Sequence, residues 1–218
     1  RTASRAIGVV WLCFGCMVVG RFLWPRATMA ERLALEVETW RSARPQRILD
    51  LFCGSGGIGI ACAYQFDEAM VDLVDISLDA LNVADINIAR HELGDRVSAV
   101  QSDVFDLLGG QTYDLIVSNP PYVDAQDLAT MPAEYHREPA LGLASGSDGL
   151  DITRRILREA ANHLNEEGVL IVEVGNSCVA LDDAFPTVPF MWLEFEHGGH
   201  GVFAMSREQL LEYAESFA

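Results

Sequence analysis

The chain has 218 residues, 50% of them apolar and 22% charged, which predicts a folded domain with a sizeable core and excludes a disordered or fibrous chain. Its formal net charge of −17 is unevenly divided: residues 1–47 carry eight Arg and three Glu, a net +5, whereas residues 48–218 carry seven Arg and 29 carboxylates, a net −22. So acidic a surface repels phosphate backbones, which argues against an enzyme of free duplex DNA and favours a basic protein partner, although solubility alone also accounts for such charge.

The first segment in chain order, residues 7–19, is an apolar run of thirteen residues, too short for the roughly 20 that a membrane-spanning helix needs. Its length also fits a signal peptide, but Gly8, Gly15 and Gly20 interrupt the run and no small-residue cleavage site follows it. We therefore expect a β-hairpin packed on the domain and no membrane anchor. The chain is divided accordingly into an N-terminal hairpin or linker, residues 1–26, and a folded domain, residues 27–218.

A helix is predicted over 28–41, where Thr28 is a candidate N-cap and Glu31 follows three residues later. After it, apolar runs alternate with helical segments: the predicted strands are 47–53, 70–75, 97–101, 113–118 and 168–174, and the predicted helices are 57–65, 78–92 and 151–164. This alternation predicts a parallel sheet with helices on both faces. Two further strands, 190–196 and 201–205, flank a turn at His197-Gly-Gly-His200 and add an antiparallel edge hairpin, so we expect a doubly wound, mostly parallel α/β sheet of seven strands.

The five cysteines are scattered and odd in number, and Cys13 and Cys16 have no second pair with which to build a four-ligand zinc site. We therefore expect no metal. Scattered, unpaired thiols also favour a reducing compartment, so the expected location is the cytoplasm.

The strand 47–53 runs into Gly54-Ser55-Gly56-Gly57-Ile58-Gly59 at the start of a predicted helix. Glycines at such a strand-to-helix turn let a ligand approach the main chain closely. The pattern matches G-x-G-x-x-G, and Asp75 ends the next strand about 20 residues further on, as in a dinucleotide site. A nicotinamide enzyme is therefore one hypothesis at this point.

Two further acids favour S-adenosylmethionine instead. Asp50 lies in the strand four residues before the first glycine, placed to meet an ammonium group rather than a pyrophosphate, and Asp103 follows the third strand. Asp75 can then accept both ribose hydroxyls and Asp103 the adenine amine, while Val104 packs against the ring. Each acid alone fits a helix cap or turn equally well, but three at successive strand ends favour a binding site.

The strand 113–118 ends in Asn119-Pro120-Pro121-Tyr122. An amide or aromatic NH2 group is a poor nucleophile, because its lone pair is delocalised, so it must be oriented to accept a methyl group. The Asn119 side-chain carbonyl and the Pro120 main-chain carbonyl can accept its two hydrogens, the prolines stiffen the loop, and Tyr122 can stack on the planar group. The tetrapeptide alone also fits a simple strand stop.

Together, Asp50-Leu-Phe-Cys-Gly54-Ser-Gly56 and Asn119-Pro-Pro-Tyr122 resemble the class I methyltransferases that act on the side-chain amide of glutamine. Further segments resemble the branch of that family that modifies a large-subunit ribosomal protein. They are Val123-Asp-Ala, Pro132-Ala-Glu-Tyr135, Glu138-Pro139, Gly146 with Asp148-Gly-Leu-Asp151, Glu173-Val-Gly-Asn-Ser177 and Trp192-Leu-Glu-Phe195 with Gly201-Val-Phe203. The resemblance covers about residues 21–210 and implies a Rossmann-like class I methyltransferase fold.

The resemblance also implies roles for individual residues. The methionine part of S-adenosylmethionine would be held by Phe52, Cys53, Gly54, Ser55 and Gly56, with Asp50 and Asn119 beside it, and the ribose and adenine by Asp75, Asp103 and Val104. The glutamine amide would be bound by Asn119, Pro120, Pro121 and Tyr122, of which Asn119, Pro120 and Tyr122 are the catalytic residues, with Glu138 and Pro139 on the substrate side. The Pro25-Arg26 step would cover the cofactor.

The expected reaction is a direct in-line transfer of methyl from S-adenosylmethionine to a glutamine side-chain amide of a basic ribosomal protein (large-subunit ribosomal protein 3-type), which leaves S-adenosylhomocysteine. Alternatives are a peptide chain release factor as substrate, an exocyclic amine of RNA or DNA, and a fragment that binds the cofactor without turnover. The family's small helical domain for substrate recognition has no counterpart in this sequence, so we expect a catalytic half.

Overall fold

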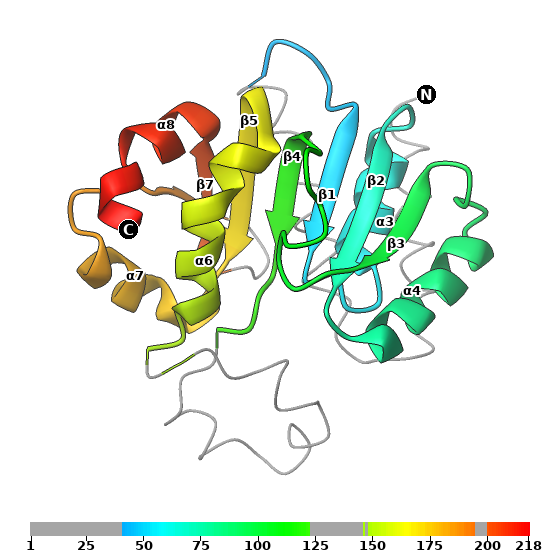
Figure 1. Ribbon diagram of the computed structural model, residues 1–218, viewed down its shortest axis with the longest axis horizontal. Helices are drawn as coiled ribbons and strands as arrows, with labels where there is room; N and C mark the ends of the chain where they lie inside the picture. Colours follow the sequence, from blue (N-terminus) through cyan, green and yellow to red (C-terminus); the bar gives the residue numbers. More distant parts are fainter. Residues whose placement is uncertain (1–40, 123–145, 147, 195–199) are drawn as a thin grey trace.

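Seven short strands, most of them apolar, form a single sheet in the order β3-β2-β1-β4-β5-β7-β6 (Figure 1). The computed structural model describes residues 41–122, 146, 148–194 and 200–218, to which all structural statements refer. The strands are β1 (Arg47–Leu51), β2 (Met70–Asp75), β3 (Val97–Gln101), β4 (Tyr113–Ser118), β5 (Leu164–Glu173), β6 (Met191–Leu193) and β7 (Val202–Ser206). The first five are parallel to their neighbours, with a register shift between Tyr113 and Leu115 where β4 pairs with β5, and β7 runs antiparallel to both β5 and β6.

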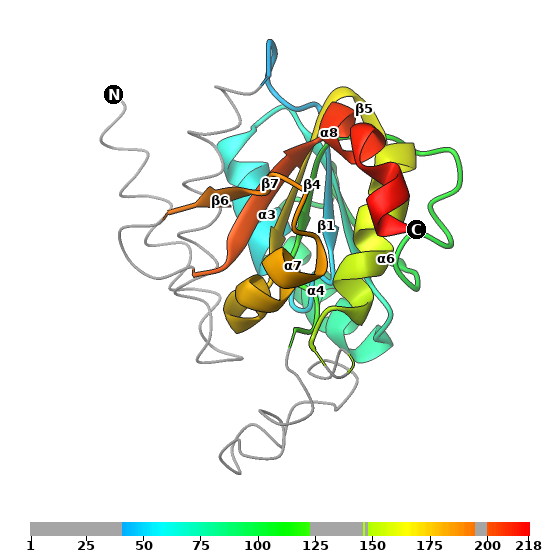
Figure 2. The same cartoon turned by 90° about the vertical axis from the view of Figure 1, so that its left-hand side faces the viewer.

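Helices cover both faces of the sheet (Figure 2). They are α3 (Gly57–Gln65), α4 (Leu78–Arg90), α6 (Asp151–Glu159), α7 (Cys178–Ala184) and α8 (Arg207–Glu212), with 3-10 turns at Ala160–His163 (η4), Gly175–Ser177 (η5) and Ala214–Phe217 (η6). Successive strand side chains point to opposite faces, so Ile48 packs with α3 and α4, whereas Leu49 packs on the side of α6, α7 and α8. Each face therefore has its own apolar core.

The expected fold class, a doubly wound, mostly parallel sheet with an antiparallel edge, is confirmed. Several boundaries differ. The predicted strand 168–174 begins earlier, at Leu164, and the predicted helix 151–164 ends at Glu159 in a 3-10 turn. Strand β1 stops at Leu51, because Phe52 has a positive φ of 62° that an extended strand cannot continue through. The hairpin and helix expected within residues 1–40 lie outside the described residues, and the short helices α7 and α8 were not expected.

At the amino edge of the sheet, the buried carboxylate of Asp114 ties three segments together. It accepts hydrogen bonds from the main-chain N–H groups of Gln46 (2.7 Å) and Arg47 (2.9 Å) and from the side chains of Asn165 (2.8 Å) and Arg41 (3.0 Å). Burial alone would raise the pKa of Asp114, but these hydrogen bonds and the charge of Arg41 outweigh it and hold that pKa below its ordinary value. The carboxylate thus fixes the start of β1 against β4 and β5.

Within the described ranges, none of the helices has the length and apolar character needed to cross a bilayer.

Candidate functional site

The carboxyl ends of β1 to β5 share one edge of the sheet, the lower edge in Figure 1. From β1 the chain moves outward through β2 and β3, and from β4 it moves the other way through β5, so the strand order reverses between β1 and β4. In open α/β sheets, ligands bind at this reversal, outside the carboxyl ends of the strands. The glycine turn follows β1 and the Asn-Pro-Pro-Tyr segment follows β4, so the two motifs lie on either side of this reversal.

Two of the turns at this edge have unusual backbone conformations at residues other than glycine. Phe52 follows β1 with φ 62°, and Val104 lies just beyond β3 with φ 50°. Positive φ is costly for a residue with a side chain, most of all for a β-branched one such as Val104, and such conformations gather at functional sites. Gly56, with φ 79°, is the N-cap of α3, and a Cβ there would lie only 2.7 Å from Leu73 Cδ1, so this position needs glycine both for its conformation and for packing.

Asp50 lies beneath the glycine turn and is fully buried. Its Oδ2 accepts a 2.7 Å hydrogen bond from the main-chain N–H of Gly59, in the first turns of α3. The structure therefore gives this carboxylate a role in fixing the turn on the strand. Its contact with a ligand ammonium stays a prediction.

Asp75 is half-buried at the end of β2 and connects two turns. Its Oδ2 accepts from the N–H of Gly54 and its Oδ1 from the N–H of Ser77, each at 2.9 Å. Ser77 in turn caps α4 through Ala80 N. A carboxylate offers about four acceptor positions, so these two bonds leave Asp75 with capacity for two ligand hydroxyls.

Beyond β3, Asp103 is exposed and paired with Arg155 of α6: the Arg155 Nη1 lies 2.7 Å from Asp103 Oδ1, and its Nη2 lies 2.7 Å from Asp106 Oδ1. Arg155 also donates to the Asp103 main-chain oxygen at 3.2 Å. One arginine thus holds both ends of this turn and leaves Asp103 Oδ2 for another partner. Val104, by contrast, is only 2% exposed and packs in the core on the α6 side.

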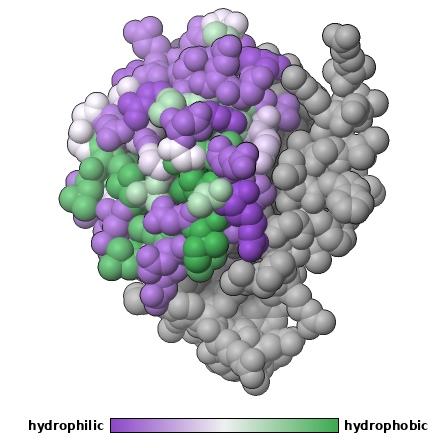
Figure 3. All heavy atoms as spheres, turned by 90° about the vertical axis from the view of Figure 1, so that its right-hand side faces the viewer, coloured by the Kyte–Doolittle hydropathy of each residue, from purple (hydrophilic) through white to green (hydrophobic). Residues whose placement is uncertain are grey.

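Ile76 is an exposed apolar side chain at this edge that was not expected from the sequence, and Leu78, which follows it, is exposed as well. Ile76 directly follows Asp75, is 47% exposed, and its carbonyl accepts from Gln101 Nε2 at 3.0 Å, so its position is fixed. An apolar residue immediately after an acid that ends a strand is the signal that could have found it. On the β3 side of the molecule the upper part is largely hydrophilic, and apolar side chains lie among hydrophilic ones below (Figure 3).

The Asn119-Pro120-Pro121-Tyr122 segment leaves the end of β4 beside β1. Ser118 Oγ donates to the Leu51 carbonyl at 3.0 Å and so joins the two strand ends at the strand-order reversal. Both prolines are buried, while Asn119 and Tyr122 are half-buried. The structure therefore brings together Asn119, Tyr122, Asp75 and the glycine turn at one edge. Glu138, Pro139 and Pro25-Arg26 lie outside the described residues.

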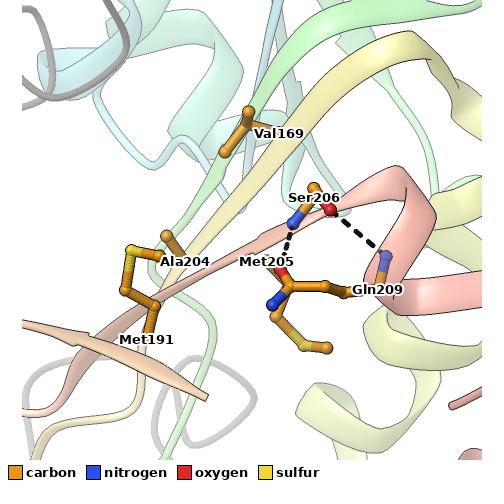
Figure 4. Close-up of a pocket in the computed structure, with 6 residues that line it drawn as sticks. All are labelled: Val169, Met191, Ala204, Met205, Ser206 and Gln209. Carbon is orange, nitrogen blue, oxygen red and sulfur yellow. Dashed lines mark hydrogen bonds between the residues drawn. The ribbon is translucent and has the colours of Figure 1, made fainter. Parts of the chain in front are cut away.

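A pocket of about 210 Å³ lies elsewhere, on β5, β6, β7 and α8 (Figure 4). It is lined mainly by apolar groups, and its polar residues, Ser206 and Gln209, bond each other in the capping box of α8. Ser206 pairs with Val169, whereas the carboxyl edge of β5 pairs with Val202, so the pocket lies toward the other end of the sheet. It offers no group for chemistry. Among the described residues, no cluster of His, Cys, Asp and Glu is arranged to bind a metal ion.

Comparisons with known proteins agree with this geometry. A family model described as the methyltransferase small domain matches residues 26–135, half of the chain. A ribosomal protein uL3 glutamine methyltransferase of Francisella tularensis is 52% identical over 199 residues, which cover 90% of this chain and 63% of the relative. A ribosomal protein uL3 glutamine methyltransferase of Neisseria gonorrhoeae is 46% identical over 200 residues, which cover 91% of this chain and 67% of the relative. The chain thus spans about two thirds of the length of these curated relatives.

Solved structures share the fold at low sequence identity. A methyltransferase from Pyrococcus furiosus aligns with a TM-score of 0.58 and 18% identity over 83% of this chain and 82% of its own. A ribosomal protein L11 methylase from Lactobacillus delbrueckii subsp. bulgaricus aligns with a TM-score of 0.52 and 20% identity over 81% of this chain and 77% of its own. The resemblance inferred from the motifs is confirmed: the chain belongs to the methyltransferase small domain family, in the group of protein-glutamine methyltransferases that the two curated relatives represent.

Proposed function

We propose that this chain transfers a methyl group from S-adenosylmethionine to the side-chain amide nitrogen of a glutamine in ribosomal protein uL3. The observation that carries the proposal is the position of Asn119-Pro120-Pro121-Tyr122 at the strand-order reversal, after β4 and beside the glycine turn of β1, which has the Asp75-terminated strand β2 on its other side. The names of the two curated relatives supply the substrate.

The polar groups at this edge of the sheet suit S-adenosylmethionine, which supplies an electrophilic methyl group when bound. Residues 52–56 offer main-chain groups for its methionine part, Asp75 has acceptor capacity for ribose hydroxyls, and Asp103 keeps Oδ2 for the adenine amine. Ile76 presents exposed apolar surface on which a purine ring can pack. This assignment gives the ring contact to Ile76 and leaves Val104 to contribute through its main chain, since its side chain is buried.

On the acceptor side, this chain's residues orient a weak nucleophile. The Asn119 side-chain carbonyl and the Pro120 main-chain carbonyl accept the two amide hydrogens of the glutamine, which aims the nitrogen at the methyl group. The prolines have fixed φ and no N–H, so the two acceptors are held in place before the substrate arrives. Tyr122 stacks on the planar amide. No strong base is required, because the proton leaves after the nitrogen has become cationic.

The charge of the chain fits a basic protein substrate. Residues 48–218 carry a net −22, which attracts a cationic ribosomal protein and repels RNA or DNA phosphates. We therefore place the substrate contact on this acidic domain and the reaction in the cytoplasm, where ribosomal proteins are made.

Incubation of the purified chain with labelled S-adenosylmethionine and, separately, uL3, a release factor and ribosomal RNA tests the proposal. We expect label on one glutamine of uL3 and a loss of about 100-fold or more in Asn119→Ala, whose missing carbonyl leaves the amide unoriented. Asn165→Ala, which removes an amide at the opposite edge of the sheet, is the matched control and should keep its rate per folded molecule. Label on RNA or on the release factor, with none on uL3, would contradict the proposal.

A further inference from the structure

Three glycines and one serine, from three separate segments of the chain, surround the last residue of the acceptor motif. Gly149 precedes α6, Gly175 and Ser177 belong to η5 at the end of β5, and Gly201 precedes β7. All of them lie next to Tyr122 or next to one another. We call these four residues the Tyr122 support.

The main chain of Tyr122 is held by two of them. Ser177 Oγ donates a 2.9 Å hydrogen bond to the Tyr122 carbonyl. A Cβ at Gly149 would overlap that same carbonyl and would lie 2.5 Å from Ser177 Oγ, so only glycine fits beside this bond. The carbonyl at the end of the motif is therefore fixed by a directional bond in a space with no room for movement toward Gly149.

The Tyr122 ring is held by the other two. A Cβ at Gly175 would lie 2.6 Å from Tyr122 Cε2 and 2.9 Å from Tyr122 Cζ, so the ring rests directly on the Gly175 main chain. Gly175 is itself held by close packing: the Gly201 main chain lies so near that a Cβ at Gly201 would overlap the Gly175 carbonyl. The neighbouring Val174 N–H also donates to the Gly201 carbonyl at 2.7 Å. The antiparallel edge of the sheet thus supports the tyrosine ring through one layer of main chain.

We propose that the four residues of the Tyr122 support are positioning residues for methyl transfer. Gly149 and Ser177 fix the position of the Tyr122 carbonyl. Gly175, which packs on Gly201, fixes the orientation of the Tyr122 ring on which the acceptor amide stacks. The inference rests on the proposed function, in which Tyr122 stacks on a planar amide. The rate of such a transfer depends strongly on the positions of the reacting groups, since a misplacement of about 1 Å lowers it on the order of 100-fold. A Cβ at residue 175 would lie 2.6 Å from Tyr122 Cε2, about 1 Å inside an ordinary carbon–carbon contact, so one added methyl is enough to displace the ring by that distance.

Two glycine variants separate displacement of the Tyr122 ring from the strain that alanine causes wherever φ is positive. Gly175 has φ 50° and Gly110 has φ 76°, so alanine is strained at both, by roughly 1–2 kcal/mol. A Cβ at Gly110, however, meets no atom of the described residues within 4 Å, whereas at Gly175 it meets the tyrosine ring. Gly175→Ala is therefore the test and Gly110→Ala the matched control. Ser177→Ala is the second test variant, because it adds no bulk, and Ser98→Ala, on an exposed serine, is its control.

The first readout does not depend on any reaction. In protein labelled with 3-fluorotyrosine, the five tyrosines give separate ¹⁹F resonances, and Tyr122→Phe identifies the one from Tyr122. We expect Gly175→Ala to shift this resonance and Gly110→Ala to leave it unchanged. An unshifted resonance in Gly175→Ala would overturn the proposal whether or not the chain methylates glutamine.

The second readout separates positioning from cofactor binding. We expect Gly175→Ala to lower kcat/KM for the uL3 acceptor by about 30- to 100-fold and Ser177→Ala by about 10-fold, while calorimetric Kd values for S-adenosylmethionine stay within twofold of wild type. Equal rates in Gly175→Ala and Gly110→Ala, or a parallel loss of cofactor affinity, would overturn it. Absence of glutamine methylation in the wild-type chain would instead refute the proposed function, while the ¹⁹F shift would still report on the support.

Discussion

The Asp75→Asn substitution separates a ligand contact from a simple loop cap. The carboxylate already accepts from Gly54 N and Ser77 N, one bond on each oxygen, and has two acceptor positions left. Asparagine keeps one oxygen with two acceptor positions and replaces the other by an NH2 donor, which faces a main-chain N–H. The variant therefore loses one internal hydrogen bond and one position that a ribose hydroxyl would use.

The expected magnitudes follow from that count. A hydrogen bond to a charged group contributes about 1.5–3 kcal/mol, so losing one ligand bond raises the Kd for S-adenosylmethionine by roughly 10- to 150-fold. The internal bond is half-exposed, so its loss lowers the free energy of unfolding by only about 1 kcal/mol. Affinity should thus fall much more than stability.

Isothermal titration calorimetry with S-adenosylmethionine and urea unfolding measure the two quantities. Asp72→Asn is the matched control: it lies on the same strand, three residues before the edge, and its carboxylate accepts from Tyr113 (2.9 Å), Ser98 (2.9 Å) and Arg47 (3.2 Å). We expect it to lose stability but to bind the cofactor normally. If Asp75→Asn lowers stability and leaves the Kd within twofold of wild type, Asp75 is only a loop cap and does not bind the ribose.

Three further outcomes are expected. Arg155→Gln should release the Asp103 turn and raise the cofactor Kd by about 3- to 10-fold in a salt-dependent way, because the pair is partly exposed; calorimetry at two salt concentrations checks this, and a salt-independent change would speak against an ion-pair role. Asp114→Asn should cost about 2–4 kcal/mol at neutral pH. The folded pKa of Asp114 is below the unfolded value of about 3.9, so its contribution to stability is complete above that pH and is lost as the pH falls through the folded pKa. The free energy of unfolding, measured by urea unfolding at each pH from 6 to 2, should therefore fall less steeply with decreasing pH in the variant than in the wild type. The fully buried Cys62 has its thiol pKa raised by burial and then by the charge of Asp50, so a thiol reagent should modify it only at the rate of unfolding, and rapid modification of the native chain would contradict the structure.

The regular part of the fold could be predicted because its signals are local. Alternating apolar runs and helical segments lie next to each other in the sequence and specify βαβ units. Helix α8 was missed although Ser206 and Gln209 form a capping box that the sequence displays. Helix α7 has no such cap, and at seven residues it is too short for a periodic signal. The early start of β5 depends on pairing of Leu164 with Tyr113, a contact between distant segments.

The sequence predicted those parts of the candidate site that lie at or just after the ends of strands. Asp75, Asp103 and Asn119 follow from the rule that parallel strands bring their carboxyl ends to one edge. Their partners did not follow, since Arg155 is 52 residues away from Asp103 and nothing local connects them. Val104 is buried and has a positive φ, a conformation that a β-branched residue rarely adopts and that is therefore not expected from sequence. The Tyr122 support could not be predicted either, because Gly149, Gly175 and Gly201 meet only in the folded chain.

Mass spectrometry of uL3 from cells with and without the gene for this chain measures glutamine methylation in the cell itself. We expect one methyl group on the side-chain amide of a single glutamine when the gene is present. That methyl group should be absent when the gene is deleted, and it should be restored by the wild-type gene but not by one encoding Asn119→Ala. A glutamine that stays methylated in the deletion, or is unmethylated in both strains, would contradict the proposed function.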